Sequence, residues 1–291
     1  MAQEWKCSGL RWSAQGPVLT WDGGRRSPLS WGKRVSFEVA AGGVRRCVGA
    51  RGHPCPLRAA VSARSTGARC EECARLDRAH SVAADGIADD PRPYHVYLAW
   101  FGPGLVKVGI TAVERGSARL LEQGAVCFTW LGAGPLMAAR RAEELLRAAL
   151  RVPDRIPYAV KRAVRAALPA TEEERAGEIG EVYAKAARLG GWPDSLAPEP
   201  FRSVDHVRAF GLTDAPAAHG EVRELVAGGS LSGELVAAAG PDLHLAAPDG
   251  VVVLDTRLMR GWELVAAASG EVALPVRRFE APPDHRQDGL F

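Results

Sequence analysis

The strongest constraint on the fold is the order of residue patterns between positions 94 and 150. Two short apolar stretches, rich in aromatic and β-branched residues, flank Gly102-Pro103-Gly104, and this combination is typical of a β-hairpin. A helical pattern, a third strand and a strongly periodic second helix follow. The expected segments are strands at 95–101, 105–110 and 126–131, a helix that includes Arg119, and a helix at 136–150.

Two tripeptides and two single residues of this unit stand where a known family has its motifs. His95-Val96-Tyr97 and Lys107-Val108-Gly109 lie on the two hairpin strands, Arg119 lies on the first helix, and Glu143 lies on the second. This arrangement resembles the GIY-YIG nuclease domain, in which the tripeptides are Gly-Ile-Tyr and Tyr-Ile-Gly. The resemblance covers about a fifth of the chain. More broadly, the whole sequence resembles an uncharacterised bacterial family of domains of unknown function, in which a cysteine cluster precedes a VKVGIT segment.

The resemblance implies a role for each matched residue. Tyr97 would be the general base, Glu143 would bind Mg or Mn, and Arg119 would contact the phosphate. Lys107 replaces the second tyrosine of the family and would add a further phosphate contact. Arg119 lies two residues later than the family's arginine, and Arg115 is its rival for that role.

A cluster of four cysteines precedes this unit. Its spacing is C-x7-C-x14-C-x2-C, and the closely spaced last pair allows two thiolates to face one ion. Zn²⁺ accepts four such ligands tetrahedrally, so a structural zinc site is expected, in which His53 could replace one of the first two cysteines. The four thiols could instead form disulfides or stay unpaired, whereas Cys7 and Cys127 are expected to be small core residues. The expected ligands are Cys47, Cys55, Cys70 and Cys73.

Composition divides the rest of the chain into regions. Turn dipeptides near 8–19 recur near 232–243, which predicts two related β-meanders that either pack together or form separate small barrels. A disordered tail is expected from Ala281. The fold predicted is α+β: a GIY-YIG-like α/β core with an N-terminal β/zinc-knuckle region and a C-terminal β domain. The expected limits are 1–80 for the β and zinc-knuckle region, 93–168 for the core, 169–200 for a helical connector and 203–291 for the acidic β domain.

The charge distribution favours an anionic partner. Residues 1–80, 81–170 and 171–291 carry net charges of +8, +4 and −9, so the basic side chains gather in the first part of the chain. There is no export signal and no apolar run long enough to span a membrane, so we expect a cytoplasmic protein without a membrane partner.

These observations predict a zinc-containing nucleic-acid-binding protein, acting on DNA or RNA, whose core hydrolyses phosphodiester bonds in a metal-dependent reaction. Whether the chain is an enzyme is left open. It could instead be a catalytically inactive nucleic-acid-binding module, or a protein-interaction scaffold in which the acidic C-terminal domain binds a basic protein partner.

Overall fold

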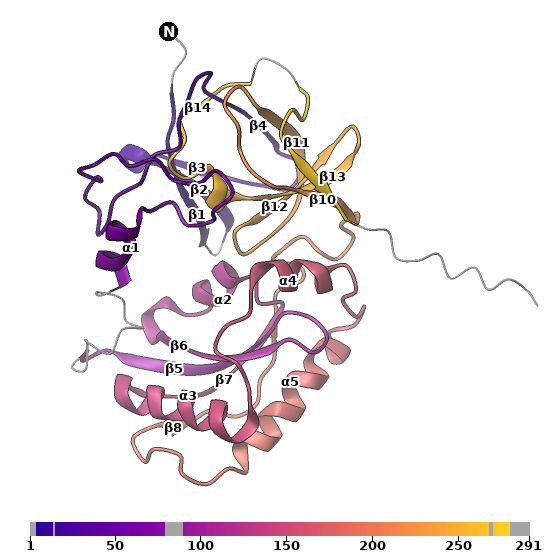
Figure 1. The fold of residues 1–291 in the computed structure, drawn as a ribbon. Helices are drawn as coiled ribbons and strands as arrows, with labels where there is room; N and C mark the ends of the chain where they lie inside the picture. Colours follow the sequence, from indigo (N-terminus) through magenta and orange to yellow (C-terminus); the bar gives the residue numbers. More distant parts are fainter. Residues whose placement is uncertain (1–3, 14, 79–89, 268–269, 280–291) are drawn as a thin grey trace, which may run out of the picture.

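The chain folds into two halves that meet along helices α2 and α4 (Figure 1). A computed structural model describes residues 4–13, 15–78, 90–267 and 270–279. One half contains two β-sheets, and the other contains a third sheet covered by helices. The predicted α+β class is confirmed, whereas the expected disorder from Ala281 onwards lies outside the described residues.

The α/β half is built on an antiparallel sheet with helices on both faces. Alternate side chains of the central strand enter different cores: Val96 and Leu98 pack with α3 and α5, whereas Tyr97 and Ala99 pack with α2. The strands are β5 (Pro93–Trp100), β6 (Val106–Ala112), β7 (Cys127–Pro135), β8 (Ala197–Pro198) and β9 (Val204–Asp205). The helices are α2 (Ala118–Gln123), α3 (Leu136–Leu150), α4 (Tyr158–Arg165) and α5 (Glu172–Ala187), with a 3-10 turn at Val113–Arg115.

The β half is organised by a seven-stranded sheet that joins both ends of the chain. Strand β4 from the N-terminal region lies between β14 and β11 from the C-terminal region, with Ser36 opposite Ser232. The spatial order is β14 (Leu264–Val265), β4 (Arg34–Val39), β11 (Ser230–Ala239), β12 (Asp242–Ala247), β13 (Gly250–Asp255), β10 (Ala218–Val222) and β15 (Val276–Arg278). The predicted limits of the terminal domains stay predictions, although both ranges supply strands to this one sheet.

A three-stranded antiparallel sheet packs against the same core as the large sheet. Trp12 and Leu19 share that core with Leu243, and the Trp12 indole donates a hydrogen bond to the Gly240 carbonyl at 2.8 Å. The two meanders predicted from the turn motifs therefore pack together. The strands are β1 (Cys7–Ser13), β2 (Gly16–Trp21) and β3 (Arg26–Pro28), and the short helices of this half are α1 (Glu71–Arg78) and the 3-10 turns Asp22–Gly24 and Thr256–Met259.

The two halves touch at two glycines, Gly124 and Gly240, which have no side chain. A Cβ on Gly240 would lie 3.0 Å from the Gly124 amide nitrogen, so the end of α2 abuts the β11–β12 turn closely. Beside this contact, Arg162 of α4 pairs with Asp242 and Asp255 of the large sheet. Helix α4 is thus anchored to both halves. Across the part of the chain that the structure describes, no helix combines the length and apolar character needed to cross a membrane.

Candidate functional site

A cavity of about 1110 Å³ lies beside β6, the edge strand of the α/β sheet. Its walls come from β5, β6, α2, α3, α4 and the loop before α4. All four residues that the sequence marked as catalytic candidates line it. They are Tyr97, Lys107, Arg119 and Glu143.

Tyr97 reaches this cavity because the strand beside it carries a glycine. Gly109 is the direct partner of Tyr97 across the β5–β6 ladder, and a Cβ on Gly109 would lie 2.4 Å from the phenol oxygen. The ring can therefore lie flat over the neighbouring strand. Gln123 of α2 donates a hydrogen bond to the phenol oxygen at 2.8 Å. Burial raises the pKa of Tyr97, and this effect outweighs the nearby charges of Arg119 and Arg115.

Lys107 and Glu143 face the same space from β6 and α3. The Lys107 ammonium donates a hydrogen bond to the Asp154 carbonyl at 3.0 Å, and burial together with the charge of Arg119 lowers its pKa to about 8. Burial raises the pKa of Glu143, while Lys107 opposes that shift. No hydrogen bond or ion pair within the described chain occupies the Glu143 carboxylate.

Both candidates for the family's arginine lie at the cavity rim. Arg115 forms an ion pair with Glu122 at 2.6 Å, whereas Arg119 lies 3.8 Å from the same carboxylate, and the two arginine side chains are similarly exposed. The Arg119 guanidinium is the less constrained of the two. It is therefore the better placed to bind a ligand that enters from solvent.

Sequence reasoning missed Lys161 of α4, which also lines the cavity. Its ammonium donates a hydrogen bond to the Gln123 carbonyl at 3.0 Å and lies 3.7 Å from the centre of the Phe101 ring and 4.4 Å from that of Tyr158. The spacing of Tyr158 and Lys161 places both on one face of a helix, a signal available in the sequence. Nothing in the sequence showed that this face would turn towards Tyr97.

The cavity is strongly basic. Its three acidic side chains are Glu143, Glu144 and Asp154. Its nine basic side chains are Arg92, Lys107, Arg115, Arg119, Arg140, Arg141, Arg147, Arg155 and Lys161. Positive charge therefore dominates its surface, and a polyanion is the ligand that such a surface attracts.

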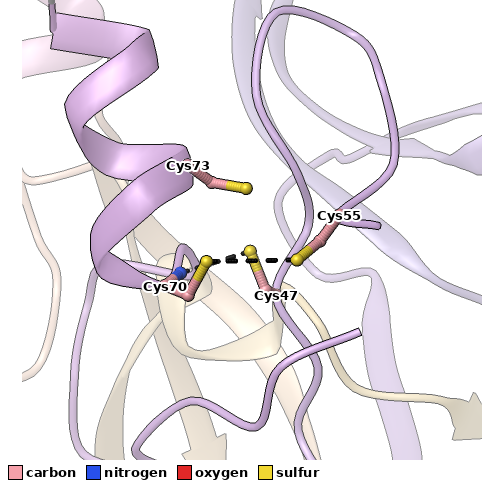
Figure 2. A group of neighbouring side chains, drawn as sticks. All are labelled: Cys47, Cys55, Cys70 and Cys73. Carbon is pink, nitrogen blue, oxygen red and sulfur yellow. Dashed lines mark hydrogen bonds between the residues drawn. The ribbon is translucent and has the colours of Figure 1, made fainter. Parts of the chain in front are cut away.

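The second candidate site is the cysteine cluster. The four sulfur atoms of Cys47, Cys55, Cys70 and Cys73 all lie within 4.8 Å of one another and point towards a common centre (Figure 2). The sulfurs of Cys55 and Cys70 are 3.9 Å apart, close to the separation of about 3.8 Å that a tetrahedral site with Zn–S bonds of about 2.3 Å requires. The group can hold a metal ion.

Local backbone geometry brings the four thiols together. Cys70 immediately precedes α1 and Cys73 lies in its first turn, whereas Cys47 and Cys55 come from loops. The Cys70 amide donates a hydrogen bond to the Cys47 sulfur at 3.2 Å. A hydrogen bond from the Ala59 amide lowers the pKa of Cys55 to about 7, whereas burial raises that of Cys73 to about 12.

His53, Cys7 and Cys127 lie outside the four-cysteine cluster. His53 is exposed and is not part of the group, so the cysteines alone form it. Cys7 and Cys127 are buried in the cores of the two halves, which confirms the prediction for both. Burial raises the pKa of each thiol to about 12.

Fold and sites together define an α+β protein with a four-cysteine cluster and a basic cavity. A family model described as "Protein of unknown function (DUF2797)" matches residues 32–264, so the chain belongs to that family. This confirms the expected family of domains of unknown function. No curated protein and no solved structure matches the chain. The description of the family names no activity, so the nuclease resemblance rests on the residues alone.

Proposed function

We propose that this protein binds nucleic acid in the basic cavity and hydrolyses a phosphodiester bond there. The observation that carries the proposal is the meeting of Tyr97, Arg119 and Glu143, from three different elements, at the wall of one cavity. The sequence order of these residues resembles that of the GIY-YIG nucleases. The excess of basic side chains around them supplies the electrostatic attraction that a phosphate backbone requires.

Each residue has a distinct task in this reaction. Arg119 and Lys107 bind the phosphate and stabilise the charge that develops on it. Tyr97 is the general base that orients and deprotonates the attacking water. Burial raises the pKa of the phenol, whereas the hydrogen bond from Gln123 and the positive charges of Arg119 and Arg115 lower it and so favour loss of the proton.

Glu143 suits a divalent cation. Its carboxylate is partly buried, faces the cavity and has no protein partner among the described residues. Mg²⁺ is commonly held in proteins by one or two carboxylates together with phosphate oxygens and water. When bound, Mg or Mn would supply Lewis-acid stabilisation of the phosphate charge.

The test is cleavage of labelled DNA and RNA with Mg or Mn. We expect wild type to cleave, Glu143→Ala to lower the rate about 100-fold or more, and the control Glu181→Ala on the exposed face of α5 to behave as wild type. Equal cleavage by wild type and Glu143→Ala would rule out the proposed reaction. Affinity should fall steeply as salt is raised, because phosphate contacts release counterions.

A second candidate function is binding without cleavage. It is favoured by the state of Tyr97, whose hydroxyl is occupied by Gln123 and whose pKa is raised by burial, so the phenol keeps its proton at neutral pH. A salt-dependent affinity without any product in Mg or Mn would select this function.

For the cysteine cluster we infer that the metal is zinc, in a structural role. Four thiolates without an open position are the ligand set typical of structural zinc sites. Metal analysis of protein purified without added metal should give one zinc per chain. Less than about half an equivalent, with four reactive thiols, would refute the assignment.

A further inference from the structure

Two buried lysines of the basic cavity form no direct ion pair with a described residue. Lys107 is 8% exposed and Lys161 is 3% exposed. Each ammonium group donates to one backbone carbonyl, that of Asp154 or that of Gln123, and neither forms an ion pair with any residue that the structure describes. The charges of Glu143 and Asp154 favour protonated Lys107, and that of Asp242 favours protonated Lys161, but burial outweighs them and lowers the pKa of both lysines. A buried ammonium group that is only partly compensated is costly, and a bound anion would reduce that cost.

Both lysines lie around the phenol of Tyr97. The Lys107 nitrogen is 5.7 Å from the centre of the Tyr97 ring. Lys161 contacts the backbone of Gln123, and the side chain of Gln123 contacts the phenol oxygen. The two ammonium groups and the phenol therefore belong to one small region of the cavity wall.

A third polar group lines the same cavity without a partner. The hydroxyl of Thr111 is buried, and no described residue accepts or donates a hydrogen bond to it. Thr111 lies on the same face of β6 as Lys107 and Gly109, because the three residues alternate along the strand. One unsatisfied buried hydroxyl and two buried ammonium groups without an ion pair, all in one cavity, are the groups that an anionic ligand would satisfy.

We propose that Lys161 and Lys107 form an inner anion subsite of the cavity, and that its ligand is a phosphate group. The source of that phosphate is nucleic acid, which rests on the proposed function; the subsite itself rests on the two lysines. Lys161 is then a phosphate-binding residue that the resemblance to the nucleases does not supply. The exposed arginines at the rim attract the backbone, and the two buried lysines hold one phosphate.

The subsite should respond to pH near neutrality. Burial, the charge of Lys107 and the charge of Arg165 lower the pKa of Lys161 to about 7, and Arg119 acts in the same direction. Asp242 is the charge that opposes them, and the neighbouring Tyr158 is neutral because burial raises its pKa to about 12. Burial and the charge of Arg119 lower the pKa of Lys107 to about 8, against the charges of Glu143 and Asp154. A bound anion favours the protonated lysines, so binding should take up protons and weaken as pH rises through the range 7 to 9.

The test measures binding of inorganic phosphate to the full chain by calorimetry, without divalent ions. We expect wild type to bind, and Lys161→Met and Lys107→Met each to bind at least about tenfold more weakly. The control Lys185→Met, on the exposed end of α5, should bind as wild type. Sulfate, whose charge does not change between pH 6 and 9, gives the pH profile: its affinity for wild type should fall as pH rises, and the decline should be smaller in Lys161→Met.

A stability measurement separates a binding role from a structural one. Because the folded state disfavours the proton on Lys161, removal of this lysine should raise the thermal midpoint at pH 7, and the gain should shrink as pH rises towards the ordinary lysine pKa of about 10.4. A lower midpoint together with weaker binding would mean that Lys161 is structural, and it would overturn the proposal.

Two binding measurements, one with inorganic phosphate and one with oligonucleotides, separate this proposal from the proposed function. Absence of phosphate binding by wild type, or equal binding by wild type and Lys161→Met, overturns the subsite whatever the protein does with nucleic acid. A second arm uses a short oligonucleotide with and without a 5′-phosphate. Phosphate binding that depends on Lys161, with no affinity for either oligonucleotide, would confirm the subsite and overturn the proposed function.

Discussion

At the scale of single residues, Gly109 determines whether the cavity exists in its present form. A Cβ at this position would lie 2.4 Å from the Tyr97 oxygen, so the ring, which is buried and hydrogen-bonded to Gln123, would have to shift. We expect Gly109→Ala to lower the free energy of unfolding by about 1–3 kcal/mol and to displace the phenol from Gln123. Urea unfolding measures the change in the free energy of unfolding. The difference in tyrosine absorption between wild type and Gly109→Ala measures the displacement of the Tyr97 phenol.

The matched control for that substitution is Gly177→Ala. Gly177 lies within α5, and a Cβ there would meet nothing within 4 Å. Alanine should stabilise the helix by about 0.5–1 kcal/mol, because it loses less backbone entropy than glycine. If Gly109→Ala has the same free energy of unfolding as wild type, Tyr97 can move away without cost, and there is no structural reason for glycine at this position.

The same scale shows which part of the site could be predicted from the sequence. Tyr97, Arg119 and Glu143 could be expected in one cavity because their order along the chain resembles that of the GIY-YIG nucleases. Lys161 and Gln123 could not be predicted, because their contact with Tyr97 depends on how α4 and α2 pack over the sheet. The spacing of residues along a helix shows which side chains share one face, but it does not show which element packs against that face.

At the scale of elements, α1 depends on the cysteine cluster. The helix has eight residues, and Cys73 is its one buried residue, so it has little apolar surface with which to dock. We expect chelation of the metal to unfold α1 and to lower the thermal midpoint by several degrees, with recovery after zinc is added. Circular dichroism before and after chelation measures the change; an unchanged spectrum and midpoint would contradict a structural role for the metal.

Elements with a complete local signal could be predicted closely. Helix α3 occupies the limits expected from its periodicity, and α5 begins at the capping box of Thr171 and Glu174. Strands β8 and β9 were not predicted. Each has two residues and is defined only by its pairing with β7, so no local pattern marks it.

At the scale of the whole molecule, the pairing of β4 with β11 was beyond sequence reasoning. Nearly 200 residues separate Ser36 from Ser232, and alternation within each strand does not specify its partner. The turn motifs did suggest related meanders at the two ends of the chain. Their packing against one core became visible only in the structure.

The contact between the two halves depends on a buried ion cluster. Arg162 of α4 is 2.6 Å from Asp242 and 2.5 Å from Asp255, and the Asp242 carboxylate is fully buried. Burial would raise the pKa of Asp242, but the charges of Arg162 and Arg165 outweigh it and lower the pKa below its ordinary value. The stabilisation from this carboxylate is therefore present above its ordinary pKa of about 4 and is lost as pH falls through its lower folded value.

Removal of Arg162 should therefore weaken both the fold and the cavity. We expect Arg162→Met to lower the free energy of unfolding by about 3 kcal/mol at pH 7, because it leaves a buried carboxylate with less compensation, and the difference from wild type should shrink below pH 4. The control Arg147→Met breaks an exposed pair with Glu144 and should cost less than about 0.5 kcal/mol. Because α4 also carries Lys161, Arg162→Met should bind phosphate more weakly. If Arg162→Met is as stable as wild type in urea at pH 7, apolar contacts hold the two halves together instead.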